Sequence, residues 1–200
     1  TGTLNTSNSV TNAGTFTNDE SFSAPTVTNS GIFTNNKTFS ATDVVNTLTF
    51  GNTGTLNTSN SVTNAGTFTN ENTGTLTGIN TVTNSGTFTN EGDFNAVDVE
   101  NTETLENTGT LNVTTMNNEG NTLGDGTYNI LGNFTSSGTF FSAAGTVYMN
   151  GTSVQIMTMA AATFNNLTID NAASVTLIST QTVITNTLTI NTEKVFKIEA

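Results

Sequence analysis

A bulky apolar residue recurs about every six positions through the first half of the chain, where few other residues are bulky. A helix needs apolar residues at three- and four-residue steps, so this spacing excludes an amphipathic helix. It predicts very short strands, each pointing one side chain inward and two outward, joined by tight turns. The flanking residues are mostly Thr, Ser, Asn and Gly, as in the segment from Gly66 to Asn70.

The apolar residues sort into three interleaved sets, each with its own residue type. Residues 1–18 recur unchanged at 53–70, and three six-residue steps make a unit of about 17–18 residues. Like residues are therefore expected to stack on like in successive coils, one set on each side of a three-sided rod. The first side takes Leu4, Phe22, Phe39, Leu56, Leu76, Phe94 and Leu111; the second takes Val10, Val27, Val44, Val62, Val82 and Val99; the third takes Phe16, Phe33, Phe50, Phe68, Phe88 and Leu105.

This pattern predicts an all-β fold, a parallel β-solenoid (a three-sided β-helix) of about eleven coils of 17–21 residues. Hexapeptide-step repeats are expected over 1–111, irregular transition coils over 112–135, and longer coils of the same solenoid over 136–200. Parallel crossovers are right-handed in about 98% of cases, whereas hexapeptide-step prisms run left-handed. We favour the right-handed form and leave the other open. Amide ladders are predicted at one corner, from Asn12, Asn29, Asn46, Asn64, Asn84 and Asn101.

Charge and composition exclude several classes of function. The formal net charge is −12, from fifteen carboxylates against Lys37, Lys194 and Lys197, so neither nucleic acid nor an anionic membrane surface is an expected partner. The chain has no cysteine, which excludes disulfides and thiolate metal sites. No apolar run reaches membrane-spanning length, so no membrane insertion is expected. The chain opens in mid-repeat without a visible signal peptide.

The repeat units resemble a known family. The Asn-x-Gly-Thr-Phe-Thr-Asn units and the later GTVYMNGTSVQIM and TNTLTI segments are similar to the repetitive β-solenoid surface adhesins of Bacteroidetes. That resemblance implies export by the type IX secretion system, a bacterial cell-surface location, and a structural role as a stalk or filament. Surfaces or glycans are the partners it implies. Both ends look uncapped, which predicts either end-to-end self-association or continuation in a longer chain.

Outward threonines on the third side suggest an alternative, an ice-binding role. Thr-x-Thr pairs there would place hydroxyls about 6.7 Å apart along a strand and about 4.8 Å apart between coils, which resembles the arrays of solenoid antifreeze proteins. Ile32, Gly51 and Glu106 interrupt the array, and Thr is also a favourable strand residue on an exposed face. The candidate array is Thr15, Thr17, Thr67, Thr69, Thr87 and Thr89.

Acidic residues crowd into one predicted coil, where Asp93, Asp98 and Glu100 are candidate calcium ligands. We favour a solvated acidic band that discourages lateral aggregation and keep calcium as the alternative, because no calcium-loop motif is present. Catalysis is not expected, and neither is a cofactor. The chain has no histidine for acyl transfer, and no long loop that would shape a cleft around a carboxylate pair.

Overall fold

The computed structural model describes residues 3–199, and all the secondary structure assigned there is β. All the strand pairings are parallel, and the strands form one continuous sheet. The strands are β1 (Thr3–Asn5), β2 (Val10–Asn12), β3 (Thr15–Asn18), β4 (Ser21–Asn29), β5 (Ile32–Asn35), β6 (Thr38–Asn46), β7 (Thr49–Asn52), β8 (Thr55–Asn64), β9 (Thr67–Asn70), β10 (Thr75–Asn84), β11 (Thr87–Asn90), β12 (Asp93–Asn101), β13 (Thr104–Asn107), β14 (Thr110–Asn118), β15 (Asn121–Leu123), β16 (Thr127–Ile130), β17 (Phe134–Phe141), β18 (Thr146–Met149), β19 (Gln155–Ile169), β20 (Val175–Ser179), β21 (Thr182–Ile190) and β22 (Phe196–Glu199).

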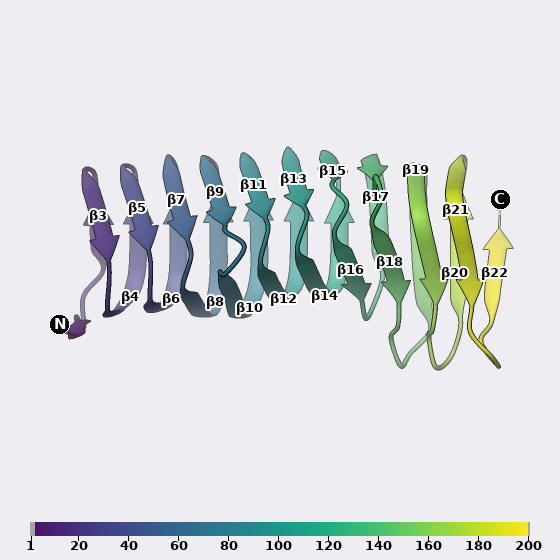
Figure 1. Cartoon of the computed structure of the whole chain (residues 1–200), viewed down its shortest axis with the longest axis horizontal. Helices are drawn as coiled ribbons and strands as arrows, with labels where there is room; N and C mark the ends of the chain where they lie inside the picture. Colours follow the sequence, from purple (N-terminus) through teal and green to yellow (C-terminus); the bar gives the residue numbers. More distant parts are fainter. Residues whose placement is uncertain (1–2, 200) are drawn as a thin grey trace.

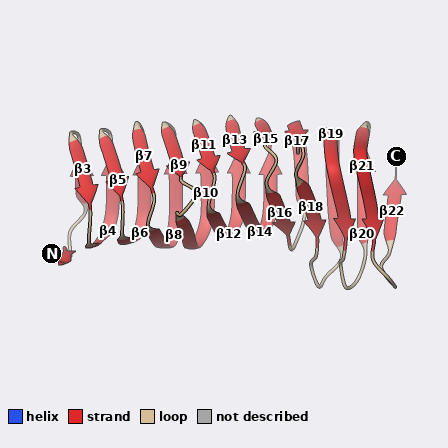
Figure 2. Ribbon diagram, in the orientation of Figure 1, coloured by secondary structure: helices blue, strands red, loops and turns tan. Residues whose placement is uncertain are grey.

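The chain winds into a rod whose coils follow one another from end to end (Figure 1). In the view of Figure 1 the near strands run downward and the far strands upward while the chain advances from left to right. The winding is therefore right-handed. Figure 2 shows strands along the whole rod, linked by short loops that lengthen toward the C-terminal end. The predicted all-β parallel solenoid is confirmed.

The three predicted columns of apolar residues exist. On the first side Leu4 pairs with Phe22, Phe22 with Phe39, and so on to Leu188, which gives eleven coil levels in agreement with the sequence estimate. The valines of the second side and the phenylalanines of the third side pair in the same way. Between the ends of the rod these side chains form one continuous buried core along the axis, whereas Leu4 and Leu188 at the ends of their column are exposed.

Two details of the predicted coil were wrong. The first and second sides are not separate short strands, because one strand of nine or ten residues covers both by bending. In β4 the alternation of inward and outward residues breaks at Pro25 and Thr26, where two successive residues face outward and form the corner. The short strands of the third side send two residues inward, not one, as Phe33 and Asn35 show in β5.

The predicted asparagine ladder is present, and a second one accompanies it. In each ladder the Nδ2 of one Asn donates to the Oδ1 of the Asn one coil further on, over 2.6–2.8 Å. Both columns are almost fully buried. The first ladder contains Asn12, Asn29, Asn46, Asn64, Asn84, Asn101 and Asn118, and the second contains Asn18, Asn35, Asn52, Asn70, Asn90 and Asn107.

Each ladder amide also closes its corner of the coil. The Nδ2 of Asn64, for example, donates to the carbonyl oxygen of Gly66 in the following turn and to that of Thr87 one coil on. Glycine fills many of these turns because coil backbones approach closely there: a Cβ at Gly86 would meet the carbonyl oxygen of Gly66. The corner asparagines therefore tie side chain, turn and neighbouring coil together.

The coil changes its construction where the two asparagine ladders end. The first ladder ends when Asn118 donates to Ser136 Oγ, and the second ends when Asn107 donates to a backbone carbonyl. Beyond that point a buried Gln155 side chain holds another corner, by donating to two carbonyls and accepting from Gly151. Coil length also rises, and one step reaches 23 residues, between Asn133 and Ile156, above the expected upper value of 21.

Candidate interaction surfaces

The candidate threonines lie on the third side, on strands β3, β9 and β11. Register places Thr67 beside Thr87 and Thr69 beside Thr89, so these four residues form a continuous two-coil patch. Thr15 and Thr17 lie on the same side but are separated from this patch by the coils of β5 and β7.

The three residues expected to interrupt the array do lie beside its threonines on adjacent coils. Ile32 lies between Thr15 and Thr49, and Gly51 lies between Thr34 and Thr69. Glu106 follows Thr89 in the next coil. The array is therefore a small regular patch within a mixed polar surface. Its column through Thr67 and Thr87 is longer than its column through Thr69 and Thr89, because Thr49 and Thr104 extend the former on either side.

A stack of aromatic rings supports this patch from inside. Phe33, Phe50, Phe68 and Phe88 have successive ring centroids 4.6–4.7 Å apart and planes within 5° of parallel. The inward phenyl group and the outward threonines alternate along the same short strands, so the ring stack fixes the positions of the strands that carry the hydroxyls. The ring stack therefore holds the threonine-bearing strands β9 and β11 at a regular spacing.

The predicted calcium ligands share one strand but not one site. Asp98 and Glu100 flank the buried Val99 on the second side of β12, whereas Asp93 begins the same strand on the first side. Their partners on neighbouring coils are threonines and an asparagine, not further carboxylates. Within residues 3–199 no group of three acidic side chains is placed to hold a metal ion, and the calcium site stays a prediction.

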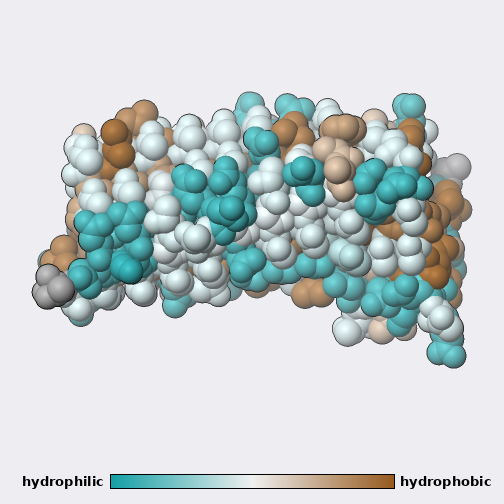
Figure 3. All heavy atoms as spheres, in the orientation of Figure 1, coloured by the Kyte–Doolittle hydropathy of each residue, from teal (hydrophilic) through white to brown (hydrophobic). Residues whose placement is uncertain are grey.

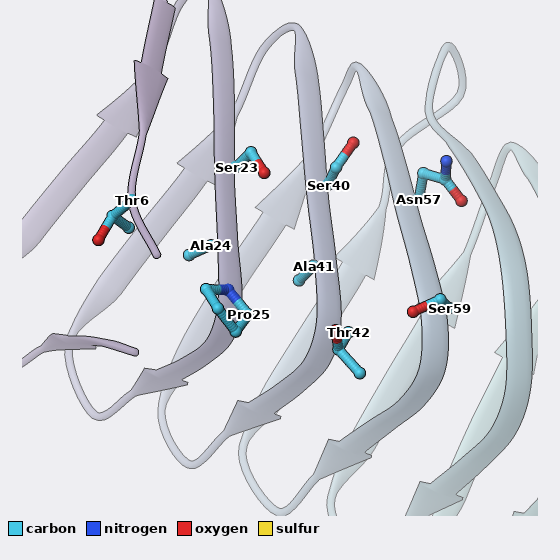
Figure 4. A pocket seen from close by; sticks show the side chains of 9 residues that line it. All are labelled: Thr6, Ser23, Ala24, Pro25, Ser40, Ala41, Thr42, Asn57 and Ser59. Carbon is cyan, nitrogen blue, oxygen red and sulfur yellow. The ribbon is translucent and has the colours of Figure 1, made fainter. Parts of the chain in front are cut away.

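A shallow groove runs across the first coils, on strands β4, β6 and β8, and sequence reasoning did not identify it. Figure 4 shows its small, uncharged lining, with alanines between rows of hydroxyl and amide groups. The signal for it lay in the register, which stacks Ser23 on Ser40 and Ala24 on Ala41. The groove contains no acid–base pair and offers only weak polar contacts. Its lining comprises Thr6, Ser23, Ala24, Pro25, Ser40, Ala41, Thr42, Asn57 and Ser59.

Hydrophobic surface gathers toward the C-terminal end of the rod. The face shown in Figure 3 carries residues of intermediate and polar character with scattered hydrophobic groups, and a larger hydrophobic group lies near the C-terminal end. In the last coil the exposed apolar residues include Leu188, Ile190 and Ile198. No helix in the described part of the chain is long and apolar enough to cross a membrane.

Comparison with known proteins finds no matching family model, no similar curated protein and no similar solved structure. The function is therefore argued from the geometry of this chain.

Proposed function

We propose that the chain is a non-enzymatic structural segment of an extracellular adhesin, stalk or filament. The single observation that supports this most is the pair of buried asparagine ladders, which join successive coils along the rod in addition to the backbone pairing. Hydrogen bonds within a buried chain strengthen one another, and a repeat whose units contact only their neighbours transmits load along its axis. Such a rod holds attached parts at a fixed distance.

The outer surface suits weak, distributed contact. Outward positions of the repeats are mostly Thr, Ser and Asn, which present hydroxyl and amide groups at regular intervals. These groups donate to and accept from the hydroxyls of glycans or of hydrated solid surfaces. Location at a bacterial cell surface, with export through type IX secretion, belongs to the same proposal and is supported by the resemblance of the repeats.

Force spectroscopy tests the load-bearing role. The chain is pulled from its two ends between flanking handles, and the rod is expected to yield in steps of whole coils. Releasing a coil of about 17 residues lengthens the chain by about 50–60 Å. Smooth extension at low force, without steps of that size, contradicts the stalk proposal.

Bead adhesion tests the surface role. Beads coated with the chain are expected to attach to glycan-coated or mineral surfaces, and Thr67→Glu with Thr87→Glu is expected to reduce attachment several-fold. Thr83→Glu, on the second side, is the matched control. Antibody labelling of intact source cells tests the location, since labelling only after lysis rules out a cell-surface role.

A second candidate, ice binding, is favoured by the aligned ring stack beneath Thr67 and Thr87, because ice recognition needs a rigid, regular hydroxyl array. The isolated chain should then show thermal hysteresis, which Thr67→Tyr or Thr87→Tyr removes and Thr83→Tyr preserves. Absence of hysteresis in the unmodified chain eliminates this candidate and leaves the structural one intact.

A further inference from the structure

One dipeptide of the chain is chemically labile. Asn150 and Gly151 form the only Asn-Gly pair in the sequence, and glycine has no side chain to hinder ring closure by the preceding asparagine. In that reaction the backbone nitrogen of Gly151 gives up its proton and bonds to Cγ of Asn150. The Cγ–Nδ2 bond breaks, ammonia leaves with that proton, and a cyclic imide remains. Water then opens the imide to aspartate or isoaspartate.

Close packing of the coils explains why glycine occupies this corner. A Cβ at Gly151 would meet the carbonyl oxygen of Leu131 on the preceding coil. The carbonyl oxygen of Gly151 accepts from the Ala172 N–H of the following coil, at 2.9 Å. The labile pair is therefore held between two neighbouring coils, and a larger residue in place of the glycine would force those coils to shift.

At the ladder asparagines the backbone itself holds the nitrogen that would attack. The N–H that follows each of them donates to the carbonyl oxygen of the ladder asparagine one coil earlier, as Ser85 N–H does to Asn64 at 2.8 Å. A hydrogen bond to the acceptor stabilises the protonated nitrogen and keeps it in the plane of the strands. Coil pairing therefore suppresses ring closure at Asn84.

At Gly151 a side chain holds the nitrogen instead. The Gly151 N–H donates to Gln155 Oε1 at 3.0 Å. The Gln155 side chain is fully buried, and its Nε2 donates to the carbonyl oxygens of Ile130 and Gly132. Asn171 Nδ2 donates to the same Oε1 at 2.7 Å. Gln155 is fixed by these bonds, so it fixes the backbone nitrogen of Gly151 in turn.

The other reacting group also lacks assistance. Ring closure places negative charge on Oδ1 of Asn150, and hydrogen-bond donors have to stabilise that charge for the reaction to be fast. This oxygen is buried, and among the described residues it has no hydrogen-bond partner. A carboxylate oxygen in its place would be a buried charge without a partner, which destabilises a fold. The folded corner thus opposes both the reaction and its product.

We propose that Asn150 is the deamidation site of this chain and that Gln155 is the positioning residue that suppresses the reaction in the folded rod. Gln155 acts by binding the Gly151 N–H, so deamidation becomes fast only when this corner opens. The device is independent of what the outer surface of the rod binds.

Peptide mapping by mass spectrometry, during incubation in mildly alkaline buffer, measures deamidation at each asparagine. The unmodified chain should deamidate at Asn150 far more slowly when folded than in guanidinium chloride. Gln155→Leu removes the acceptor and should raise the rate at Asn150 by roughly two- to tenfold, the factor that corresponds to one net hydrogen bond. Gln155→Glu keeps an acceptor oxygen and should restore slow deamidation.

Asn171→Leu is the matched control, because it removes a buried amide from the same corner and leaves the bond between Gly151 and Gln155 in place. Its rate at Asn150 should stay near that of the unmodified chain, and circular dichroism verifies that each variant is folded. Equal rates in the folded and unfolded unmodified chain overturn the proposal without any variant. An unchanged rate in folded Gln155→Leu, an equal acceleration in Asn171→Leu, or an equal acceleration at Asn84 overturns it as well.

Discussion

Removing one ladder amide at two places with the same local sequence separates coil stacking from local preference. Residues 1–18 and 53–70 are identical, so Asn12 and Asn64 have the same neighbours in sequence. In the structure Asn64 lies between two coils, whereas Asn12 lies in the first described coil. Asn12→Ala and Asn64→Ala therefore make the same chemical change in different stacking environments.

The expected losses follow from the hydrogen bonds. Asn64 accepts from Asn46 and donates to Asn84, both at 2.8 Å, and also donates to two backbone carbonyls. Asn12 donates to Asn29 and to the carbonyl oxygen of Ile32 and accepts from the Gly14 N–H, but no ladder donor precedes it in the described chain. A net bond contributes about 0.5–1.5 kcal/mol, and a buried group left unpaired adds a further cost. We expect Asn64→Ala to lower the free energy of unfolding by about 3 kcal/mol and Asn12→Ala by about 1 kcal/mol, since water replaces bonds at the edge.

Equilibrium urea unfolding followed by far-UV circular dichroism measures both losses. Asn60→Ala is the control, because its amide bonds only to Asp43 at the exposed surface, and its effect should stay below about 0.5 kcal/mol. Equal losses for Asn12→Ala and Asn64→Ala would refute the reasoning, because they would show that the ladder adds nothing beyond its own turn. A loss at Asn64 as small as the control would refute it too.

Three further predictions concern the core. Thr58 is buried with no partner for its hydroxyl, so Thr58→Val should raise the urea midpoint and the free energy of unfolding, the latter by about 1 kcal/mol. The buried hydroxyl of Thr122 donates to a ladder amide, so Thr122→Val should lower the free energy of unfolding instead. Phe68→Ala should lower the free energy of unfolding by about 3–5 kcal/mol, because the Phe68 ring is stacked on both sides. Phe16 is half-buried in the first coil, so Phe16→Ala should lower it clearly less. Similar urea midpoints for the two variants would contradict the stacking argument. Burial raises the pKa of the Tyr128 phenol well above its ordinary value of 10, so the folded chain keeps a proton that the unfolded chain releases. The free energy of unfolding should therefore fall as pH rises above about 10. Tyr128→Phe should lessen that fall in urea titrations, and an unchanged pH profile in this variant would contradict the prediction.

The sequence was sufficient for the columns because the apolar residues are sparse and regularly spaced. Each of Phe22, Val27 and Phe39 is the only bulky apolar residue of its step, so one winding alone places like on like. Handedness could not be settled that way, because both hands place the same residues in the same columns. It became visible only in the path of the backbone (Figure 1).

The second asparagine ladder shows where periodicity was underused. Asn35 follows Phe33 by two residues, the spacing of two inward positions on a strand, and this spacing recurs in every short strand that ends in Thr-Asn. Treating these strands as three-residue units with one inward residue concealed it. The bend at Pro25 was concealed for a different reason: paired outward residues look like a loop, although the backbone pairing continues through them.

The central claim is that each unit of three six-residue steps forms one coil, so equivalent residues of successive units lie one coil apart along a straight axis. The cysteine-free chain permits spin labels at chosen pairs of outward positions on the third side, namely Thr15→Cys with Thr67→Cys, with Thr87→Cys and with Thr139→Cys. These pairs are three, four and seven coils apart by strand register. Pulsed electron paramagnetic resonance should give mean separations that rise in proportion to the number of coils, near 14, 19 and 34 Å at about 4.8 Å per coil. Separations that do not increase with coil number would contradict the account.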